Sequence, residues 1–347
     1  MSSSTAHKLL APLAAAAIAL GGLVVLDRLP ESARAETVPE RLHETHAEPT
    51  ETDGVVRQSA AVTEEQHRAI LSYWTAERMA AARPITDLLG HLTDLPNAEE
   101  MLPGIGAEHQ AAPRDDSTGA RWTAGGQVVR TTGKVFLTMD GRDFTCSASV
   151  VDSTNRSTVV TAGHCAKDGR GSWARNWTFV PGATDGSAPH GRYTARDLLV
   201  SPEWSRRADD SYDFAMVVLN TESGRTVQDR VGSQRISFGA WTEAGVREGV
   251  QIYSFGYPAA SPYDGRELHY CSGRTRPDTG GTTANGMACR MTQGSSGGPW
   301  MVGFDSTTGR GTVASVVSFK YANDRRTQYG PRFGAEARNV YDRAARL

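Results

Sequence analysis

Short runs of apolar and β-branched residues, separated by turn residues, fill the chain from about residue 120 onward. These runs are rich in Val, Thr, Ser and aromatic side chains, a composition that is typical of β-strands. Helical periodicity is nearly absent from most of this region. The pattern predicts an all-β domain with strands near residues 135–139, 144–151, 158–162, 214–219, 250–257, 267–271, 300–303 and 312–319.

The end of the chain carries a helical period instead. Residues 335–347 place Ala337, Val340, Tyr341 and Ala344 on one side of a helix. An apolar stripe of this kind predicts a terminal helix that packs on the β domain.

A second helical pattern lies upstream of the β domain. Thr63 and Gln66 have the spacing of a capping box, and apolar residues then recur at helical spacing until Pro84. We therefore expect one amphipathic helix here. Its apolar stripe contains Tyr73 and Trp74 and needs a surface to cover, and the downstream domain is the only large one available.

Two further segments show no apolar period. Residues 36–62 are rich in Glu, Thr, Pro and Ala, a composition that predicts an unstructured segment. Residues 103–119 hold several Gly and Pro residues and are interpreted as a processing linker.

Residues 1–35 predict an export signal. A polar start precedes an apolar stretch from Leu9 to Leu26, and Ala33 and Ala35 frame an A-x-A cleavage site. The alternative is an uncleaved anchor, because this stretch exceeds the usual apolar region of about 7 to 15 residues. Since Pro12 disfavours a stable spanning helix, we expect cleavage after Ala35, a secreted product and no membrane attachment afterwards.

The charge balance is near neutral overall but uneven along the chain. The 347 residues include 37 basic and 39 acidic side chains, which argues against a nucleic-acid partner. Residues 36–118 carry a net charge of −10, whereas residues 119–347 carry +7. Opposite charges of this kind attract at short range, although a solvated acidic linker is the alternative. We divide the chain into a signal peptide (1–35), a pro-segment (36–118) and a β domain (119–347).

All four cysteines, Cys146, Cys165, Cys271 and Cys289, lie in the β domain. In an exported protein an even number of cysteines favours disulfides, and three pairings are open. The two local pairs would close loops of about twenty residues, worth roughly 3 kcal/mol each in the chain-entropy model. No C-x-x-C motif or His cluster accompanies the cysteines, so we expect no metal site and no cofactor.

Three short motifs carry candidate chemistry. The loop from Gly294 to Pro299 places Ser296 among glycines, whose backbone can turn tightly and approach a substrate. His164 follows a β-branched run and precedes a cysteine, and a neutral imidazole is the base that a hydroxyl nucleophile needs. Asp213 opens an apolar strand, where a carboxylate can orient an imidazole.

Two neighbouring carboxylates compete with Asp213. Asp209 and Asp210 lie in a polar turn rather than at the start of the strand. A carboxylate at the edge of a core is the better candidate for holding an imidazole tautomer, so Asp213 is preferred.

Together the Thr-Ala-Gly-His-Cys and Gly-Ser-Ser-Gly-Gly-Pro runs resemble the chymotrypsin-like serine peptidases, in particular their secreted bacterial branch with the glutamyl endopeptidases. The resemblance covers residues 120–347. It implies two antiparallel six-stranded β-barrels with the site between them. It also implies that His164 is the general base, Asp213 its orienting partner and Ser296 the nucleophile, with the amides of Gly294 and Ser296 forming the oxyanion hole.

One position departs from the digestive members of that family. They carry Asp immediately before the nucleophile, where it pairs with a freed N-terminal amine, whereas this chain carries Ser295. Since that ion pair cannot form, control must come from elsewhere. We predict that the acidic pro-segment binds the protease domain as an inhibitor or a folding aid, and that the enzyme is a monomer.

The family resemblance also places the primary substrate pocket. Its walls would include Arg290, Ser318 and Lys320, so an acidic P1 side chain could be paired there. The alternative is that Arg290 and Lys320 point to solvent, and an apolar pocket stays open. No Asp or Glu occupies positions 289–294, which leaves a preference for Lys or Arg without its usual partner.

The expected activity is cleavage of protein or peptide substrates through an acyl-enzyme. A catalytically silent homologue that acts as a secreted binding module is the alternative, because fold does not guarantee activity. An esterase with the same triad is a weaker third option. Intact candidate residues at all three triad positions favour the peptidase.

Overall fold

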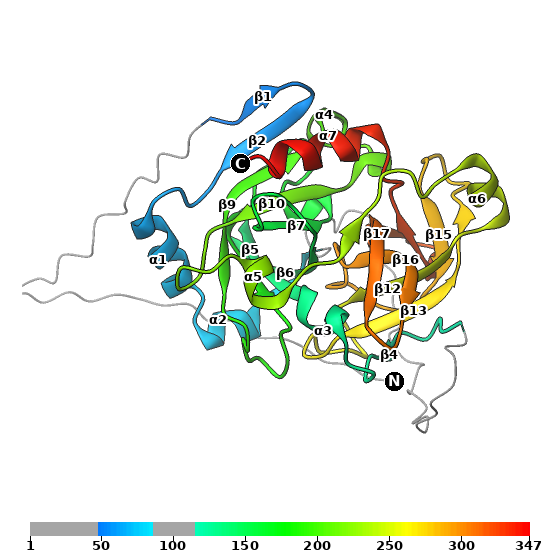
Figure 1. Ribbon diagram of the computed structural model, residues 1–347, viewed down its shortest axis with the longest axis horizontal. Coiled ribbons are helices and arrows are strands. Elements are labelled where there is room, and N and C mark those ends of the chain that lie inside the picture. The colour runs from blue at the N-terminus through cyan, green and yellow to red at the C-terminus, as the bar shows by residue number, and fades with distance from the viewer. Residues whose placement is uncertain (1–47, 86–114) are drawn as a thin grey trace, which may run out of the picture. The chain divides into compact units, whose positions relative to one another are not determined.

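The computed structural model describes residues 48–85 and 115–347 (Figure 1). The predicted signal peptide lies outside the described residues, as do residues 36–47 and 86–114 of the predicted pro-segment. Everything that is described belongs to one unit of the chain. Within these two ranges, no helix combines the length and the apolar character that a membrane span requires.

Six antiparallel strands close into a barrel in the first half of the β domain. The strands follow one another in the order β9-β10-β7-β6-β5-β8, and β8 pairs with β9 to complete the circle. Alternate side chains point inward and fill the barrel with Val, Leu, Phe and Trp residues. The strands are β5 (Thr132–Met139), β6 (Arg142–Val150), β7 (Thr158–Thr161), β8 (Arg175–Pro181), β9 (Tyr193–Val200) and β10 (Ala215–Leu219).

The second half of the domain is also β but divides its strands between two sheets. One sheet has the order β11-β17-β16-β12-β13-β4, and the other β14-β15-β19-β18. The bounds are β4 (Ala120–Arg121), β11 (Arg235–Ile236), β12 (Gln251–Gly256), β13 (His269–Arg274), β14 (Arg276–Pro277), β15 (Asn285–Ala288), β16 (Pro299–Asp305), β17 (Arg310–Val316), β18 (Phe319–Tyr321) and β19 (Asp324–Gly330). The predicted all-β fold is thus confirmed.

The predicted terminal helix is confirmed as α7 (Ala335–Ala344), which buries Ala337, Val340 and Ala344. It packs mainly on β10 and β9 (Figure 1). The remaining helices of the domain are single turns or little more. They are α3 (Gln127–Thr131), η2 (Gly163–Cys165), α4 (Pro202–Arg207), η3 (Asp210–Tyr212), α5 (Val227–Val231) and α6 (Glu243–Glu248).

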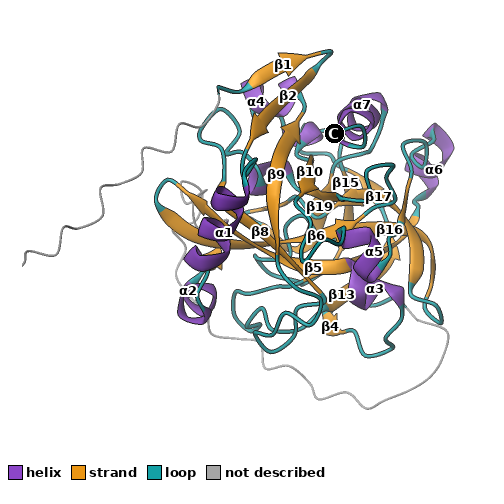
Figure 2. Cartoon of the chain, turned by 60° about the vertical axis from the view of Figure 1, so that its left-hand side comes forward, coloured by secondary structure: helices purple, strands orange, loops and turns teal. Residues whose placement is uncertain are grey.

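The segment upstream of the domain is more ordered than the sequence predicted. Residues 36–62 were expected to lack structure, but β1 (Thr50–Thr52) and β2 (Val55–Ser59) form a hairpin within them. Strand β2 also pairs with β9 of the barrel (Figure 2). The expectation was wrong because a strand with only two apolar residues can be stabilised by a partner far away in the sequence, a contact that local composition does not register.

The expected upstream helix is present in two pieces. The capping box of Thr63 and Gln66 is confirmed and starts α1 (Glu64–Tyr73). Thr75 then caps a second helix, α2 (Ala76–Ala81), and the short strand β3 (Arg83–Pro84) pairs with β6. The helix breaks at Trp74, whose ring is 1% exposed and packs against Phe136 and Val180 of the barrel.

Candidate active site

His164 lies at the point where strand β7 leaves the barrel. The strand ends at Thr161, and the turn η2 follows, with Gly163, His164 and Cys165 all buried. Cys165 is bonded to Cys146 of β6, and the indole of Trp177 donates a hydrogen bond of 2.9 Å to the carbonyl of Cys165. Cys165, the neighbour of His164 in the sequence, is therefore held both by the disulfide and by a hydrogen bond.

The carboxylate of Asp213 holds this histidine through both oxygens. Its Oδ2 lies 2.7 Å from His164 Nδ1, and its Oδ1 accepts a 2.7 Å hydrogen bond from the His164 backbone N–H. The hydroxyl of Ser318 also donates to Oδ2. Gly163 leaves room for this approach, because a Cβ there would lie 2.8 Å from Oδ1. Asp209 instead caps η3, and Asp210 begins that turn.

The buried pair shifts the pKa of each partner toward the charged state. Burial alone would lower the pKa of His164, but attraction to the Asp213 carboxylate and their hydrogen bond outweigh it and raise the pKa above its ordinary value. Burial would likewise raise the pKa of Asp213, yet His164 and Ser318 together hold it below its ordinary value.

Ser296 comes from the other half of the domain, in the loop between β15 and β16. Its carbonyl accepts a 2.7 Å hydrogen bond from the backbone N–H of Ser147, in the first barrel. The Sγ of Cys165 lies 3.7 Å from the same oxygen, so the serine backbone is beside the histidine turn. Within the described residues, His164 Nε2 is buried and has no hydrogen-bond partner. This nitrogen is the free end of the His164–Asp213 pair.

Two backbone N–H groups of the loop around Ser296 have no hydrogen-bond acceptor among the residues that the structure describes. In the described part of the chain, the amides of Ser295, Gly297 and Gly298 donate to carbonyls, whereas those of Gly294 and Ser296 have no acceptor. Gly294 has a φ of +97°, and a Cβ there would lie 2.7 Å from the carbonyl of Tyr257. The glycine is thus required by both conformation and space, and the two free amides are available to a developing oxyanion.

The predicted pocket residues are differently engaged. Ser318 donates to Asp213 and therefore contacts the His–Asp pair itself. The ammonium of Lys320 donates to the carbonyls of Cys289 and Arg325, and burial lowers its pKa to about 8 although Asp324 opposes this. Arg290 is exposed, and its backbone N–H donates to the carbonyl of Ser117 at 2.9 Å.

The cysteines form the two local disulfides, Cys146–Cys165 and Cys271–Cys289. In the described residues, the group with metal-ligand spacing is Cys146, His164 and Cys165. Both sulfurs are joined to each other, and the Nδ1 of His164 bonds to Asp213. This group therefore does not offer the thiolates that a metal ion would need.

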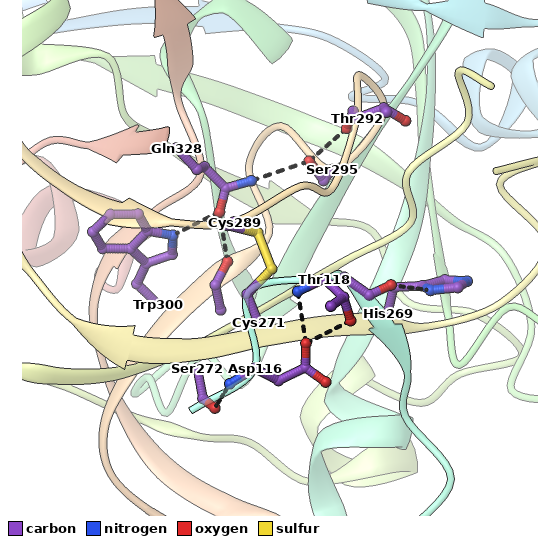
Figure 3. The surroundings of a disulfide bond; sticks show 12 residues. Asp116, Thr118, His269, Cys271, Ser272, Cys289, Thr292, Ser295, Trp300 and Gln328 are labelled. Atoms are coloured by element: carbon purple, nitrogen blue, oxygen red, sulfur yellow. Dashed lines mark hydrogen bonds between the residues drawn. A yellow bond between two sulfur atoms is a disulfide. The ribbon is translucent and has the colours of Figure 1, made fainter. Parts of the chain in front are cut away.

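Sequence reasoning missed two residues that support the loop. Ser147 donates from its hydroxyl to the carbonyl of Gly294 at 2.9 Å and accepts from the N–H of Tyr257, also at 2.9 Å. Gln328 contacts Ser295 (Figure 3). Neither lies in a motif or at a recognisable spacing from Ser296, so the sequence held no signal for them.

Comparisons with known proteins match most of the β domain. The family model described as Trypsin matches residues 123–342, well over half of the chain. The solved protease Anisep from Arthrobacter nicotinovorans is 40% identical with a TM-score of 0.59, and the match covers 63% of this chain and 96% of that one. The thermostable serine protease AL20 from an extremophilic microorganism is also 40% identical with a TM-score of 0.59, over 64% and 99%.

Two more distant matches concern the fold or a part of the chain. A Glu endopeptidase structure is 18% identical with a TM-score of 0.53, covers 67% of this chain and 98% of that one, and so shares the fold. A Bacillus subtilis protein named extracellular metalloprotease is 37% identical over 73 residues. That match spans 21% of this chain and only 23% of the length of the relative.

Proposed function

The chain belongs to the trypsin family of serine endopeptidases, and from this premise we propose that Ser296, His164 and Asp213 form its catalytic triad. The observation that carries the proposal is that Asp213 bonds to His164 at two points. Its Oδ2 lies 2.7 Å from the imidazole Nδ1, and its Oδ1 lies 2.7 Å from the backbone nitrogen. It fixes the tautomer with its basic nitrogen, Nε2, directed away from the carboxylate.

The proposed reaction proceeds through an acyl-enzyme. His164 Nε2 takes the proton of Ser296 Oγ while that oxygen attacks the peptide carbonyl carbon, and the carbonyl oxygen becomes an oxyanion. The amides of Gly294 and Ser296 stabilise that charge. The protonated imidazole then gives its proton to the leaving amine, the C–N bond breaks, and a water molecule activated in the same way releases the acyl group.

The full secreted chain and its Ser296→Ala variant test this proposal. Both are treated with a fluorophosphonate probe and with a denatured protein substrate. We expect labelling and cleavage in the parent and neither in the variant, while Ser315→Ala retains both because its buried hydroxyl donates to the carbonyl of Pro331 instead. Labelling that persists in Ser296→Ala, or a folded parent that is not labelled, would contradict the proposal. Comparing peptide with simple ester substrates separates a peptidase from an esterase.

Secretion is part of the proposal. The predicted signal at residues 1–35 supports it, and so do the two disulfides, since such bonds persist in oxidising compartments. The substrates would then be extracellular proteins or peptides.

We further propose that the pro-segment acts as a folding aid for the first barrel. The pairing of β2 with β9 supplies hydrogen bonds to the edge of β9 near Val200, a stretch that β8 does not reach. Arg57 also bonds to Asp197, a carboxylate that is 1% exposed. Without the segment, this strand edge would lose its partner during folding, and Arg196 alone would be left to pair with the buried carboxylate.

The contacts of the pro-segment favour this role over direct blockage of the site. Residues 48–85 contribute Val55, Val56, Trp74 and Ile85 to the buried clusters. Side chains of this segment bond to Asp143, Thr194 and Asp197 of the barrel, and none of these three is a proposed catalytic residue. A segment that supplies core side chains at a distance from the catalytic residues assists the fold of the domain.

For the substrate, we propose a preference for an acidic P1 side chain. The support is the positive charge of Arg290 and Lys320 on segments that would border the pocket, with no carboxylate between positions 289 and 294. Cleavage-site mapping in the experiment above tests the preference, and apolar residues before the cut bonds would contradict it.

A further inference from the structure

Ser295, the residue before the proposed nucleophile, is buried and joined to a side chain from a distant strand. Its Oγ donates to the carbonyl of Thr292 at 2.7 Å and lies 3.4 Å from Nε2 of Gln328, in β19 (Figure 3). Ser295 is 2% exposed and Gln328 is 0% exposed. The two side chains therefore interact out of reach of solvent.

The direction of these hydrogen bonds follows from the other partners of Gln328. Its Oε1 lies 3.3 Å from the indole Nε1 of Trp300, a group that can only donate. Ser254 Oγ donates to the same oxygen at 2.8 Å. With Oε1 facing two donors, the amide –NH₂ must face Ser295, which accepts from it and directs its own single proton to Thr292.

This chain of bonds closes the turn that holds the predicted oxyanion donor. The backbone N–H of Ser295 also donates to the Thr292 carbonyl, at 3.3 Å, so that oxygen is held twice. Gly294 lies inside the turn, and its N–H has no acceptor among residues 48–85 and 115–347. Rotation of this turn would redirect the Gly294 amide, and an oxyanion donor acts only if it points at the developing charge.

We propose that Gln328 is a positioning residue that sets the oxyanion turn through Ser295. The inference rests on the proposed roles of Ser296 and Gly294. The hydrogen bonds from Gln328 to Ser295 and from Ser295 to Thr292 form a neutral, buried relay. This relay takes the role that the ion pair between Asp and the freed amine has in the digestive members. The turn is therefore held by groups within the domain and does not require a freed N-terminal amine.

The full secreted chain with Ser295→Ala tests the relay directly. We expect kcat for a peptide substrate to fall about 10- to 100-fold while KM stays within twofold, because the group acts on the transition state rather than on substrate binding. The inhibition constant of a peptide aldehyde, whose adduct places an oxyanion in the same site, should rise by the same factor.

The variant Gln328→Glu adds a readout that a merely structural role would not give. A neutral carboxylic acid can donate to Ser295 as the amide does, whereas an ionised carboxylate cannot. The ratio of variant to parent kcat should therefore fall as pH rises. The double variant Ser295→Ala, Gln328→Glu should lose no more than the worse single variant, because both break one relay.

The experiments distinguish a failure of the positioning role of Gln328 from a failure of the triad proposal. Ser315→Ala removes another buried hydroxyl and should keep kcat within twofold. If Ser295→Ala keeps parental kcat, or if the Gln328→Glu ratio is flat with pH, the positioning role is overturned. Should Ser295→Ala fail to fold, the Gln328→Glu profile decides alone. Failure of the triad proposal is recognised instead by fluorophosphonate labelling that survives Ser296→Ala.

Discussion

Asp213 binds His164 at two points, the imidazole Nδ1 and the backbone N–H, each 2.7 Å from a different carboxylate oxygen. The side chain and the main chain of the histidine are therefore held by one group. Because both residues are nearly fully buried, with His164 at 4% and Asp213 at 2% exposed, their interaction is weakly screened.

This pair predicts the acidic limb of the pH profile. In the proposed mechanism the imidazole must be neutral to accept the Ser296 proton, and attraction to Asp213 raises its pKa above the ordinary value of 6.5. We expect kcat/KM to decline as pH falls through a midpoint above 6.5. Asp213→Asn removes the attraction and leaves burial, which lowers the pKa, so the midpoint should move down while kcat drops on the order of 10⁴-fold, as the same change does in a known protease with a Ser-His-Asp triad. Rates measured from pH 5 to 9 check both, and an unmoved midpoint would contradict the assignment.

The two disulfides offer a matched comparison. They span sequence separations of 19 and 18, so removing either by a double Cys→Ala change should cost roughly 3 kcal/mol of unfolding free energy. Only Cys146–Cys165 includes the neighbour of His164. We expect its loss to lower kcat, whereas loss of Cys271–Cys289 should mainly alter KM, because Cys289 precedes Arg290 and its carbonyl binds Lys320. Denaturant unfolding and steady-state kinetics measure the two effects, and equal kinetic losses would refute the distinction.

The strands that the sequence failed to predict show where pattern analysis ends. β9 contains Arg196 and Asp197 in its middle, and two adjacent charges do not suggest a buried strand. Asp197 is nevertheless buried, because Arg57 reaches it from 140 residues away. Such a contact is created by the tertiary fold, so no local window of the sequence contains it.

The residues of the candidate site were easier to predict from the sequence than the residues that hold them in position. His164 and Ser296 lie in runs whose glycines are needed locally, as the crowding at Gly163 and Gly294 explains. By contrast, Gln328 meets Ser295 only because the folded domain brings β19 beside the loop that contains Ser296. The motifs therefore indicated the proposed reacting groups, and the structure was needed to identify the residues that hold them.

Trp74 tests the role of the pro-segment. Its buried ring packs on Phe136, and its indole N–H donates to the carbonyl of Asn176. Trp74→Ala should weaken the packing of the pro-segment on the first barrel by about 3 to 5 kcal/mol and reduce the yield of folded, secreted enzyme. Tyr73→Phe, which loses only the hydroxyl contacts with Asp143 and Thr138, should have a smaller effect of about 1 kcal/mol.

Secreted yield and fluorophosphonate-reactive fraction measure the outcome of the Trp74 comparison. If the pro-segment is a folding aid, Trp74→Ala should give fewer folded enzyme molecules, and each active site should have a normal kcat. If the pro-segment is instead an inhibitor, Trp74→Ala should give a normal yield and a higher activity before processing. That result would contradict the folding role.

Lys320 tests the substrate preference. Burial lowers its pKa to about 8, so the ammonium loses its proton and its charge as pH rises through that value. If this charge favours an acidic P1 residue, the ratio of kcat/KM for peptides with Glu and Gln at P1 should fall across pH 8. Lys320→Met should show a lower ratio, by about tenfold below pH 8, with no titration near that pH. Lys134→Met is the matched control, because burial also lowers the pKa of Lys134 to about 8 but that lysine lies over Phe136 of the first barrel. A parental ratio that is flat with pH, or one that Lys134→Met alters equally, would show that Lys320 does not select the substrate.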